Sequence, residues 1–324
     1  MTEQPFVTVL MATYNGEAYL AEQLDTLLAQ TYKNWELWVR DDGSIDDTVE
    51  ILKSYQVRHP NISIYTNLTG TRGACSNFAA LFQMAKLDER VKYVMFCDQD
   101  DAWLPNKIEV TLNEMRRQED SHPGEPVMIY GDLELVDDCG RATGHSLRLK
   151  NKVDLKNLVS FNYVLGCTVM INRAMLQKIG NIPEQAVNHD YWIALVASMY
   201  HSAYISKKLI RYRQHTQNAS GNVADNDSLS ARIRRHITQP QHEIEASKAK
   251  LSMLNEFYKL YADELETKKR AMLEEYLHAY DSGRLQVCYL ILKYQMFKKG
   301  FFQSLMTFYQ VLFFYNQIAE GLWT

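Results

Sequence analysis

The chain has 324 residues, of which 46% are apolar and 23% charged, and its formal net charge is −4. This length allows one large domain or one domain with an appendage, and the composition is that of a globular protein with a substantial core. The negative net charge disfavours a generic nucleic-acid-binding protein, which needs a strongly basic face. No stretch reaches the roughly 18 continuous apolar residues of a membrane span.

The start of the chain, from Met1 to Pro5, lacks the basic-then-apolar pattern of a signal peptide. The cysteines are scattered and none forms a CxxC pair; they are Cys75, Cys97, Cys139, Cys167 and Cys288. With this scatter, we favour reduced core thiols in a reducing, cytoplasmic compartment over a zinc site or disulfides.

The N-terminal part of the sequence alternates between strand and helix patterns. Short apolar runs predict strands at 7–12, 35–39, 62–65 and 93–97. Between them, one helical stripe contains Leu20, Leu24, Leu27 and Leu28, Asp46-Asp47 is suited to cap a second helix, and 78–84 belongs to a third. Repeated strand–helix–strand units predict a Rossmann-like α/β fold, in which helices cover both faces of a mostly parallel sheet.

The pattern is less regular after residue 127. Strand-like pieces at 127–130 and 164–171 surround helices, one of them at 190–200. A polar stretch near Gly221 then precedes a region with helical, amphipathic spacing across 241–280. We therefore predict an α/β domain over 1–220 and a helical C-terminal region over 221–324.

Polar motifs follow three of the predicted strands. They are Thr13-Tyr14-Asn15-Gly16, Asp41-Asp42-Gly43-Ser44 and Asp98-Gln99-Asp100-Asp101. Ligands bind outside the carboxyl ends of strands in open parallel sheets, so these aspartates would gather along one edge. Carboxylates at such short separations repel one another unless a cation or hydrogen bonds neutralise them. The motifs therefore predict a hard divalent ion that bridges protein carboxylates and substrate phosphates.

An alternative is that each acidic motif only stabilises a turn, because Asp, Gly and Ser are common turn residues. Two such motifs directly after apolar strands disfavour this alternative. The patterns GxxxxGK[ST] and GxGxxG are missing from the sequence, which removes the main support for a P-loop or dinucleotide-binding protein.

Five motifs of the chain resemble glycosyltransferase family 2, whose members have the GT-A fold. The resemblance covers residues 6–216. It rests on Ala12-Thr13-Tyr14-Asn15, Asp41-Asp42-Gly43-Ser44, Asp98-Gln99-Asp100-Asp101, His189-Asp190-Tyr191-Trp192 and Tyr212-Arg213-Gln214-His215. Each motif alone is weak, whereas all five in this order and spacing are highly specific.

The resemblance implies a role for each matching residue on the donor side. Thr13 and Tyr14 would line the nucleobase and ribose pocket, and Asp41 or Asp42 would hydrogen-bond the base. Arg72 would reach toward the nucleotide. Asp98 would face the ribose, and Asp101 would help to orient the neighbouring acids.

On the metal and acceptor sides, the resemblance implies that Asp100 holds a Mg²⁺ or Mn²⁺ ion. His215 would contact the metal or the pyrophosphate, unless it is structural. Asp190 would be the base that deprotonates the acceptor hydroxyl, and a base opposite the diphosphate gives direct displacement with inversion. The alternative for Asp190 is a helix cap. His189 stands where the family more often has Glu, so the resemblance assigns it no role.

The segment from Phe96 to Lys107 and the pair Tyr191-Trp192 look most like the bacterial rhamnosyltransferase branch of the family. This resemblance implies dTDP-L-rhamnose as the donor, with a UDP-hexose as the alternative. The acceptor would be a glycan or lipid-linked glycan of a cell-wall or surface polysaccharide. Trp103 is either part of this signature or a core residue that fixes the loop.

Two hypotheses from other functional classes of protein remain. A sugar nucleotidyltransferase also pairs an α/β sheet with metal-binding aspartates, but its basic, Gly-rich triphosphate loop is missing near the N-terminus. A non-catalytic nucleotide-sugar-binding module would have little need for Asp100 together with Asp190. Turnover of a nucleotide sugar separates both from a glycosyltransferase.

Two strongly apolar helical stretches, at 287–297 and 301–315, lie near the C-terminus. The basic residues around them are Arg284, Lys293, Lys298 and Lys299. Such helices can lie in a membrane interface, where basic side chains meet anionic headgroups. Packing on the α/β domain or in a homodimer explains the same pattern. The sequence therefore predicts either peripheral contact with the inner face of the cell membrane or a protein contact.

Overall fold

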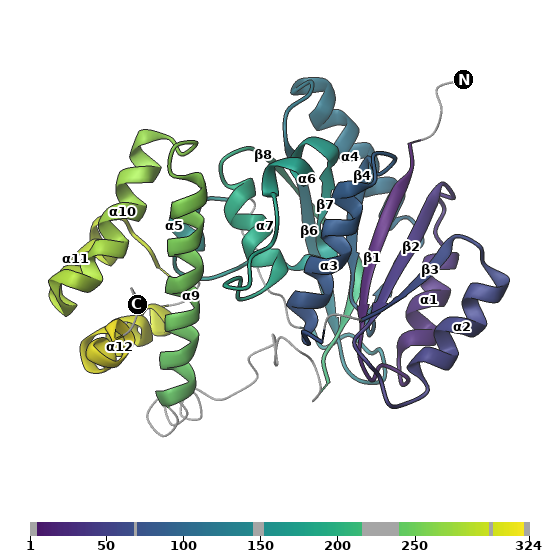
Figure 1. Cartoon of the computed structure of the whole chain (residues 1–324), viewed down its shortest axis with the longest axis horizontal. Helices are drawn as coiled ribbons and strands as arrows, with labels where there is room; N and C mark the ends of the chain where they lie inside the picture. Colours follow the sequence, from purple (N-terminus) through teal and green to yellow (C-terminus); the bar gives the residue numbers. More distant parts are fainter. Residues whose placement is uncertain (1–4, 68–69, 145–151, 216–239, 298–300, 321–324) are drawn as a thin grey trace.

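Among the residues that the structure describes, eight strands form one sheet with helices on both faces, which is the larger part of the molecule (Figure 1). The computed structural model describes residues 5–67, 70–144, 152–215, 240–297 and 301–320. The order of the strands is β3-β2-β1-β4-β7-β6-β8-β5. This mostly parallel, helix-covered sheet confirms the predicted α/β class.

All four predicted N-terminal strands are present and run parallel to one another. They are β1 (Val7–Thr13), β2 (Trp35–Asp41), β3 (Ile62–Thr66) and β4 (Tyr93–Cys97). Val7 of β1 lies opposite both Trp35 and Tyr93, so the three strands begin level and their carboxyl ends reach the same edge. In β1, Leu10 packs into one core, whereas Val9 and Met11 pack into the other, as alternation along a strand requires.

The second half of the sheet is mixed, and one predicted strand there is largely wrong. The strands are β5 (Ala102–Trp103), β6 (Val127–Val136), β7 (Met170–Asn172) and β8 (His201–Arg213). Of the strand predicted at 164–171, only the last residues are extended, because Gly166–Thr168 forms a 3₁₀ turn. The backbone N–H and the hydroxyl of Thr168 both donate to the carbonyl of Leu165, which closes that turn.

Helices α1 to α7 belong to this part of the chain. They are α1 (Leu20–Leu28), α2 (Thr48–Arg58), α3 (Ala74–Leu87), α4 (Lys107–Ser121), α5 (Leu155–Leu158), α6 (Arg173–Ile179) and α7 (His189–Ala197). Of these, α1 to α4 and α6 pack on the sheet, whereas α5 and α7 pack mainly on other helices. The predicted leucine stripe is buried at Leu20, Leu24 and Leu27. At the start of α2, the N-cap residue Asp47 makes no side-chain capping bond, and the carboxylate of the preceding Asp46 accepts the N–H of Thr48 at 3.1 Å instead.

The C-terminal part of the chain is helical, as predicted. It contains α9 (Pro240–Tyr261), α10 (Thr267–Ser282), α11 (Arg284–Lys293) and α12 (Phe301–Ala319). The predicted boundary near Gly221 lies outside the described residues. These helices pack beside α7 (Figure 1), where the ring of Trp192 lies 6.1 Å from those of both Phe257 and Tyr261. The helical region therefore shares a hydrophobic core with the α/β domain.

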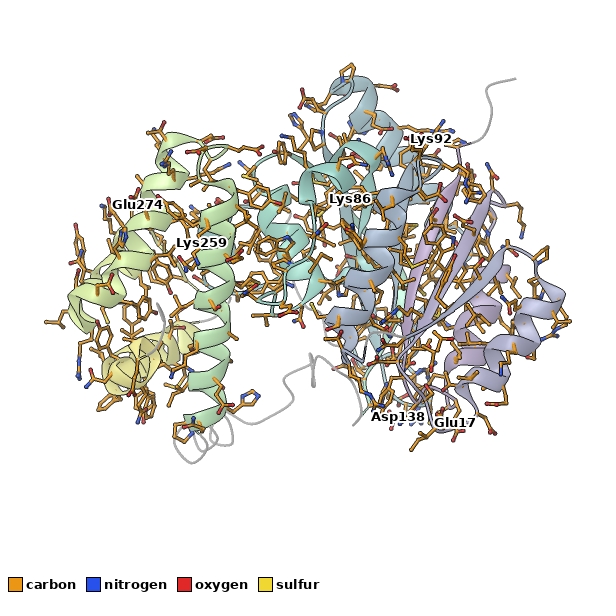
Figure 2. The ribbon with its side chains drawn as sticks, in the orientation of Figure 1. Glu17, Lys86, Lys92, Asp138, Lys259 and Glu274 are labelled. Carbon is orange, nitrogen blue, oxygen red and sulfur yellow. The ribbon has the colours of Figure 1, made fainter. Side chains whose placement is uncertain are left out.

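The polar motifs lie together at the edge where the strands β1, β2 and β4 end. Glu17, which follows β1, and Asp138, which follows β6, mark this edge in Figure 2, and Lys92, which precedes β4, lies at the opposite edge. Ligands bind at such carboxyl ends in α/β sheets, so we expect the functional site at this edge.

Candidate active site

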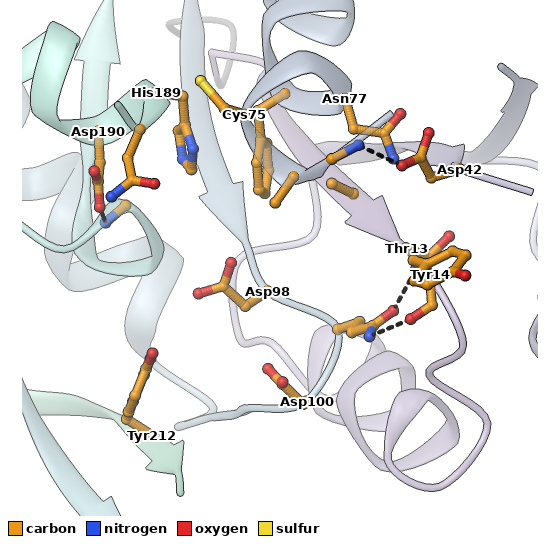
Figure 3. Close-up of a pocket in the computed structure, with 17 residues that line it drawn as sticks. Thr13, Tyr14, Asp42, Cys75, Asn77, Asp98, Asp100, His189, Asp190 and Tyr212 are labelled. Atoms are coloured by element: carbon orange, nitrogen blue, oxygen red, sulfur yellow. Dashed lines mark hydrogen bonds between the residues drawn. The ribbon is translucent and has the colours of Figure 1, made fainter. Parts of the chain in front are cut away.

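A pocket of about 350 Å³ opens at this edge, between the ends of β1, β2 and β4 and the first turns of α3 and α7. Six residues predicted for the site line it: Thr13, Tyr14, Asp42, Asp98, Asp100 and Asp190. Figure 3 shows Asp190 on one side of the pocket and Tyr14 and Asp42 on the other, with Asp98 and Asp100 between them. The other four, Asp41, Arg72, Asp101 and His215, lie behind or beside this lining.

Asp41 forms the turn that follows β2. One of its carboxylate oxygens accepts the N–H groups of Gly43 and Ser44, at 3.0 and 2.9 Å. The other accepts the hydroxyls of Thr13, at 3.0 Å, and Ser44, at 2.6 Å. Four hydrogen bonds and near-complete burial give Asp41 the structural role that the turn alternative predicted for this motif.

Asp42, unlike Asp41, faces the pocket. One carboxylate oxygen accepts the Asn67 amide at 2.6 Å, and the other accepts the Gly73 N–H at 2.7 Å. Arg72 is exposed beside this turn, with a guanidinium nitrogen 3.8 Å from the position that a Cβ on Gly43 would occupy.

A buried polar network that the sequence analysis missed supports Asp42. Arg40 is 4% exposed, and its guanidinium donates to the side-chain oxygens of Asn77 and Asn67. The Asn77 amide in turn donates to the Arg40 carbonyl at 2.8 Å. The arginine in the otherwise apolar β2 was the available signal, because a buried charge requires such partners.

Asp98 and Asp100 form the acidic centre of the pocket. Burial, together with the charges of Asp100 and Asp190, raises the pKa of Asp98 to about 7. Asp100 Oδ2 lies 2.9 Å from His215 Nε2, so the two residues predicted for the metal side of the site lie together. The pocket thus concentrates negative charge, which a divalent cation bound to carboxylate oxygens would neutralise. The donor set therefore fits the Mg²⁺ or Mn²⁺ ion that the sequence implied.

Asp101 lies beneath the pocket, only 1% exposed. It accepts the backbone N–H of Arg213 at 3.3 Å, while the Arg213 side chain donates to the carbonyl of Asp100 and to Glu22. Arg213, which belongs to a recognised motif but had no predicted role, therefore connects the acidic loop to the end of β8 and to α1.

A cluster of ionisable side chains extends from Asp98 into the protein interior. Ligand atoms of Asp98, Asp101 and Cys167 all lie within 4.8 Å of one another. Lys107 is 1% exposed, with its ammonium 3.4 Å from the centre of the Trp103 ring and without a hydrogen-bond partner among the described residues. Burial lowers the pKa of Lys107 to about 7. Trp103 is only 2% exposed, so of the two alternatives given for it, a core residue that fixes the loop describes its position.

Asp190 is held by hydrogen bonds from the loop before β7. Its carboxylate accepts the Asn162 amide and the Gly166 N–H, both at 3.0 Å. Burial raises the pKa of Asp190 to about 6, against the opposing effect of these bonds. The N-cap of α7 is Asn188, with Asp190 two residues inside the helix, so the capping alternative does not describe its position. Sequence reasoning missed Asn162 and Gly166.

His189 packs as an apolar ring. It stacks on Phe78 with 4.0 Å between ring centres, and burial lowers its pKa to about 3. A Cβ on Gly166 would lie 2.6 Å from His189 Nε2, so only glycine fits opposite this ring. The neutral histidine ring therefore packs the start of α7 closely on the loop that holds Asp190.

The aromatic pair after Asp190 turns into the core. Trp192 is fully buried, and the Tyr191 hydroxyl donates to the carbonyl of Leu158. Neither lines the pocket. This part of the signature therefore contributes packing and makes no contact with the site.

Comparisons with known proteins agree with this fold. The profile of glycosyl transferase family 2 matches residues 8–180. The chain is 29% identical over 241 residues to the dTDP-rhamnosyl transferase RfbG of Shigella flexneri, covering 69% of this chain and 77% of that one. It is 27% identical over 194 residues to the Escherichia coli protein named UDP-Glc:alpha-D-GlcNAc-diphosphoundecaprenol beta-1,3-glucosyltransferase WfgD, covering 59% and 69%.

Two solved structures share the fold. TarS of S. aureus in complex with UDP superposes with a TM-score of 0.53 at 21% identity, covering 90% of this chain and 91% of that one. The mannosyltransferase PcManGT from Pyrobaculum calidifontis, in complex with GDP-Man and Mn²⁺, gives 0.52 at 16% identity, covering 99% and 86%. With the profile match over more than half of its length, the chain belongs to glycosyltransferase family 2 and has the GT-A fold.

Proposed function

We propose that this glycosyltransferase works with inversion, moving a sugar from a nucleoside diphosphate to an acceptor hydroxyl. The observation that carries the proposal is the carboxylate of Asp190, which lines the pocket and is fixed by Asn162 and Gly166. Its pKa of about 6 leaves it ionised at neutral pH, yet basic enough to take a proton from a reacting hydroxyl.

In the proposed reaction, Asp190 accepts the proton of the acceptor hydroxyl while that oxygen attacks the anomeric carbon. The bond to the diphosphate breaks on the opposite face of the sugar. One displacement with one base inverts the anomeric configuration, and the chain forms no covalent bond to the sugar.

The nucleoside lies, in this proposal, between Tyr14 and Asp42. The Tyr14 side chain is 47% exposed at the pocket and offers a face on which a base can stack. A pyrimidine presents an N–H donor, and Asp42 presents a carboxylate acceptor. Asp42 suits this role better than Asp41, whose oxygens already accept four hydrogen bonds. Thr13 and Asp98 complete the ribose side of the pocket.

The donor we propose is dTDP-L-rhamnose. The 29% identity to a protein named dTDP-rhamnosyl transferase supports it, as does the motif from Phe96 to Lys107. A UDP-hexose is the second candidate, favoured by the relative whose name specifies UDP-Glc. Thermal-shift titration with dTDP and UDP distinguishes them, since a clear preference for the uridine nucleotide refutes the rhamnose proposal.

We propose Mg²⁺ or Mn²⁺ as the cofactor, held by Asp100 with Asp98 and His215 beside it. Such an ion supplies Lewis-acid stabilisation of the charge on the leaving diphosphate. Asp98 and Asp100 bring the required oxygen ligands to the pocket, and Arg213 fixes their loop through the Asp100 carbonyl.

The acceptor we propose is a glycan or lipid-linked glycan of a cell-wall or surface polysaccharide, elongated by a cytoplasmic enzyme at the inner face of the membrane. The relative named for a diphosphoundecaprenol acceptor supports this class. Helix α11 exposes Leu285, Tyr289 and Leu292 along one stripe, 55–75% exposed. No helix among the described residues is long and apolar enough to cross a bilayer.

The charge near this stripe favours a lipid surface over a homodimer. From Ser282 to Ala319 the sequence contains Arg284, Lys293, Lys298 and Lys299 and no acidic residue. Lys293 is paired with Glu275 at 2.6 Å, but Arg284 is exposed at the start of α11. A twofold dimer through this face would bring two such cations together, whereas anionic headgroups would neutralise them. We therefore propose peripheral contact of α11 and α12 with an anionic membrane.

A screen of nucleotide sugars tests the proposed function. Release of nucleoside diphosphate is measured for dTDP-rhamnose, UDP-hexoses and other donors, with and without lipid-linked glycan acceptors. The Asp190→Asn variant serves as the control for contaminating hydrolases. Binding without turnover of any donor would identify a nucleotide-sugar-binding module in place of an enzyme.

A further inference from the structure

The side chain of Gln99, the middle residue of the Asp98-Gln99-Asp100 motif, turns away from the acids toward the loop after β1. Its Oε1 accepts the backbone N–H of Tyr14 at 2.9 Å, and its Nε2 donates to the carbonyl of Tyr14 at 3.0 Å (Figure 3). One side-chain amide therefore satisfies both backbone groups of one residue in the neighbouring loop.

This pairing extends the sheet beyond its last strand pair. The register of β1 and β4 ends at Met11 opposite Cys97, and the chains separate after that point. A glutamine amide carries the same donor and acceptor as a peptide group. Gln99 thus supplies from its side chain the link that the backbone no longer makes, and joins the loop of Tyr14 to the loop of Asp98 and Asp100.

Gly16 provides the space for this link. A Cβ on Gly16 would lie 2.4 Å from Gln99 Oε1 and 2.6 Å from its Cδ, so any larger residue would displace the amide. Gly16 does not have a positive φ, so the contact with Gln99 sets its preference for glycine. Its N–H donates to the Thr48 hydroxyl at 2.7 Å, which fixes the loop from the other side.

We propose that Gln99 is a positioning residue that holds the nucleoside loop and the acidic loop in one arrangement, so that both ends of a nucleoside diphosphate meet a preassembled site. The proposal rests on the nucleotide-sugar function given above. Tyr14 is half exposed, and Gln99 bonds both of its backbone groups, so a loop without this link would hold Tyr14 less firmly and bind the nucleoside less well.

The test measures binding of dTDP and UDP with Mg²⁺ by calorimetry, together with donor KM and kcat. Gln99→Ala should weaken nucleotide binding on the order of tenfold, because two hydrogen bonds are lost. Donor KM should rise by a similar factor, while kcat at saturating donor stays within about threefold. Gln56→Ala is the matched control, because the Gln56 amide also donates to a backbone carbonyl, that of Ile62, outside the pocket.

A double-mutant cycle makes the test sharper. Gly16→Ala should weaken binding as Gln99→Ala does, because its methyl group displaces the amide. In the Gln99→Ala background the same glycine substitution should have almost no further effect. Additive losses, or a Gln99→Ala protein that binds like the wild type, would overturn the proposal. Failure of the wild type to bind any nucleoside diphosphate would instead reject the proposed function.

Discussion

The side-chain amide of Asn162 donates to Asp190 Oδ1 at 3.0 Å and also to the carbonyl of Val164 at 2.9 Å. Asn162 Oδ1 in turn accepts the Val164 N–H at 3.0 Å. This closed set of bonds fixes the amide, so a donor always points at Asp190. A donor at this position favours the ionised carboxylate, which is the form that a general base requires.

Asn162→Asp should therefore move the acidic limb of the pH–rate profile upward. The new carboxylate replaces a donor with a like charge, so the pKa of Asp190 rises from its value of about 6, by roughly one to two units. Less of the base is then ionised at pH 7, and activity returns as the pH rises. Asn181→Asp makes the same change at an exposed site and should keep the wild-type profile. A loss that is uniform across pH would indicate a structural role only.

Asp190→Asn should lower turnover on the order of 10²–10⁴-fold, because an amide cannot accept the acceptor's proton. Donor and metal affinity should change little, since the base addresses the acceptor. Burial raises the folded-state pKa of Asp190, so its contribution to stability falls as pH rises from about 4 to about 6. The variant lacks that decline. Near-normal turnover with saturating substrates would end the assignment of Asp190 as the base.

The sequence was sufficient to predict the acidic centre because strand order determines it. Asp42, Asp98 and Asp100 follow parallel strands that begin level, so their meeting at one edge needs no knowledge of loop conformation. The roles of Asp41 and Asp101 were less predictable. Adjacent residues after a strand point in different directions, and only the turn geometry decides which one faces the pocket.

The sequence could not predict the contacts that loops and buried helices make around the site. Asn162 and Gly166 meet Asp190 through a 3₁₀ turn that the apolar run at 164–171 disguised as a strand. Trp192 looked like part of a donor signature, yet α7 is buried almost all round among α3, α6 and α9, so its aromatic residues fill the core. The sequence also did not predict β8, because several of its residues are polar and exposed. The last residue of this strand, Arg213, fixes the acidic loop.

Lys107→Met should change how stability depends on pH. Burial lowers the folded-state pKa of Lys107 to about 7, while the unfolded chain keeps a value of about 10.4. Between these values the unfolded state binds more protons, so wild-type stability rises with pH, by an amount on the order of a few kcal/mol. The methionine variant should lose this rise and be more stable than the wild type at pH 7. Urea unfolding at pH 7 and pH 9.5 measures both effects, and parallel curves would contradict them.

Asp100→Ala should abolish the metal dependence of nucleotide binding and lower turnover at least on the order of a hundredfold. Calorimetry with and without Mg²⁺ or Mn²⁺ provides a readout that does not require activity. Asp47→Ala removes an exposed carboxylate at the start of α2 and should leave metal-dependent binding intact. Full activity of the wild type in excess chelator would refute the metal assignment.

The proposed membrane contact predicts binding to anionic vesicles that depends on the stripe of α11. The full-length protein should float with vesicles containing phosphatidylglycerol, bind neutral vesicles weakly, and release at high salt. Leu285→Glu combined with Leu292→Glu should reduce flotation by at least about tenfold, because acidic residues then face the headgroups. Both leucines are more than half exposed, so the substitutions leave the core intact.

Leu260→Glu is the matched control for this experiment, because Leu260 is an exposed leucine, 55% accessible, on α9. The control should float like the wild type, which shows that an added acid does not by itself prevent binding. Light scattering of the same proteins examines the competing explanation. If the double variant floats normally but changes from dimer to monomer, the stripe is a contact between two copies of the chain, and the lipid proposal is wrong.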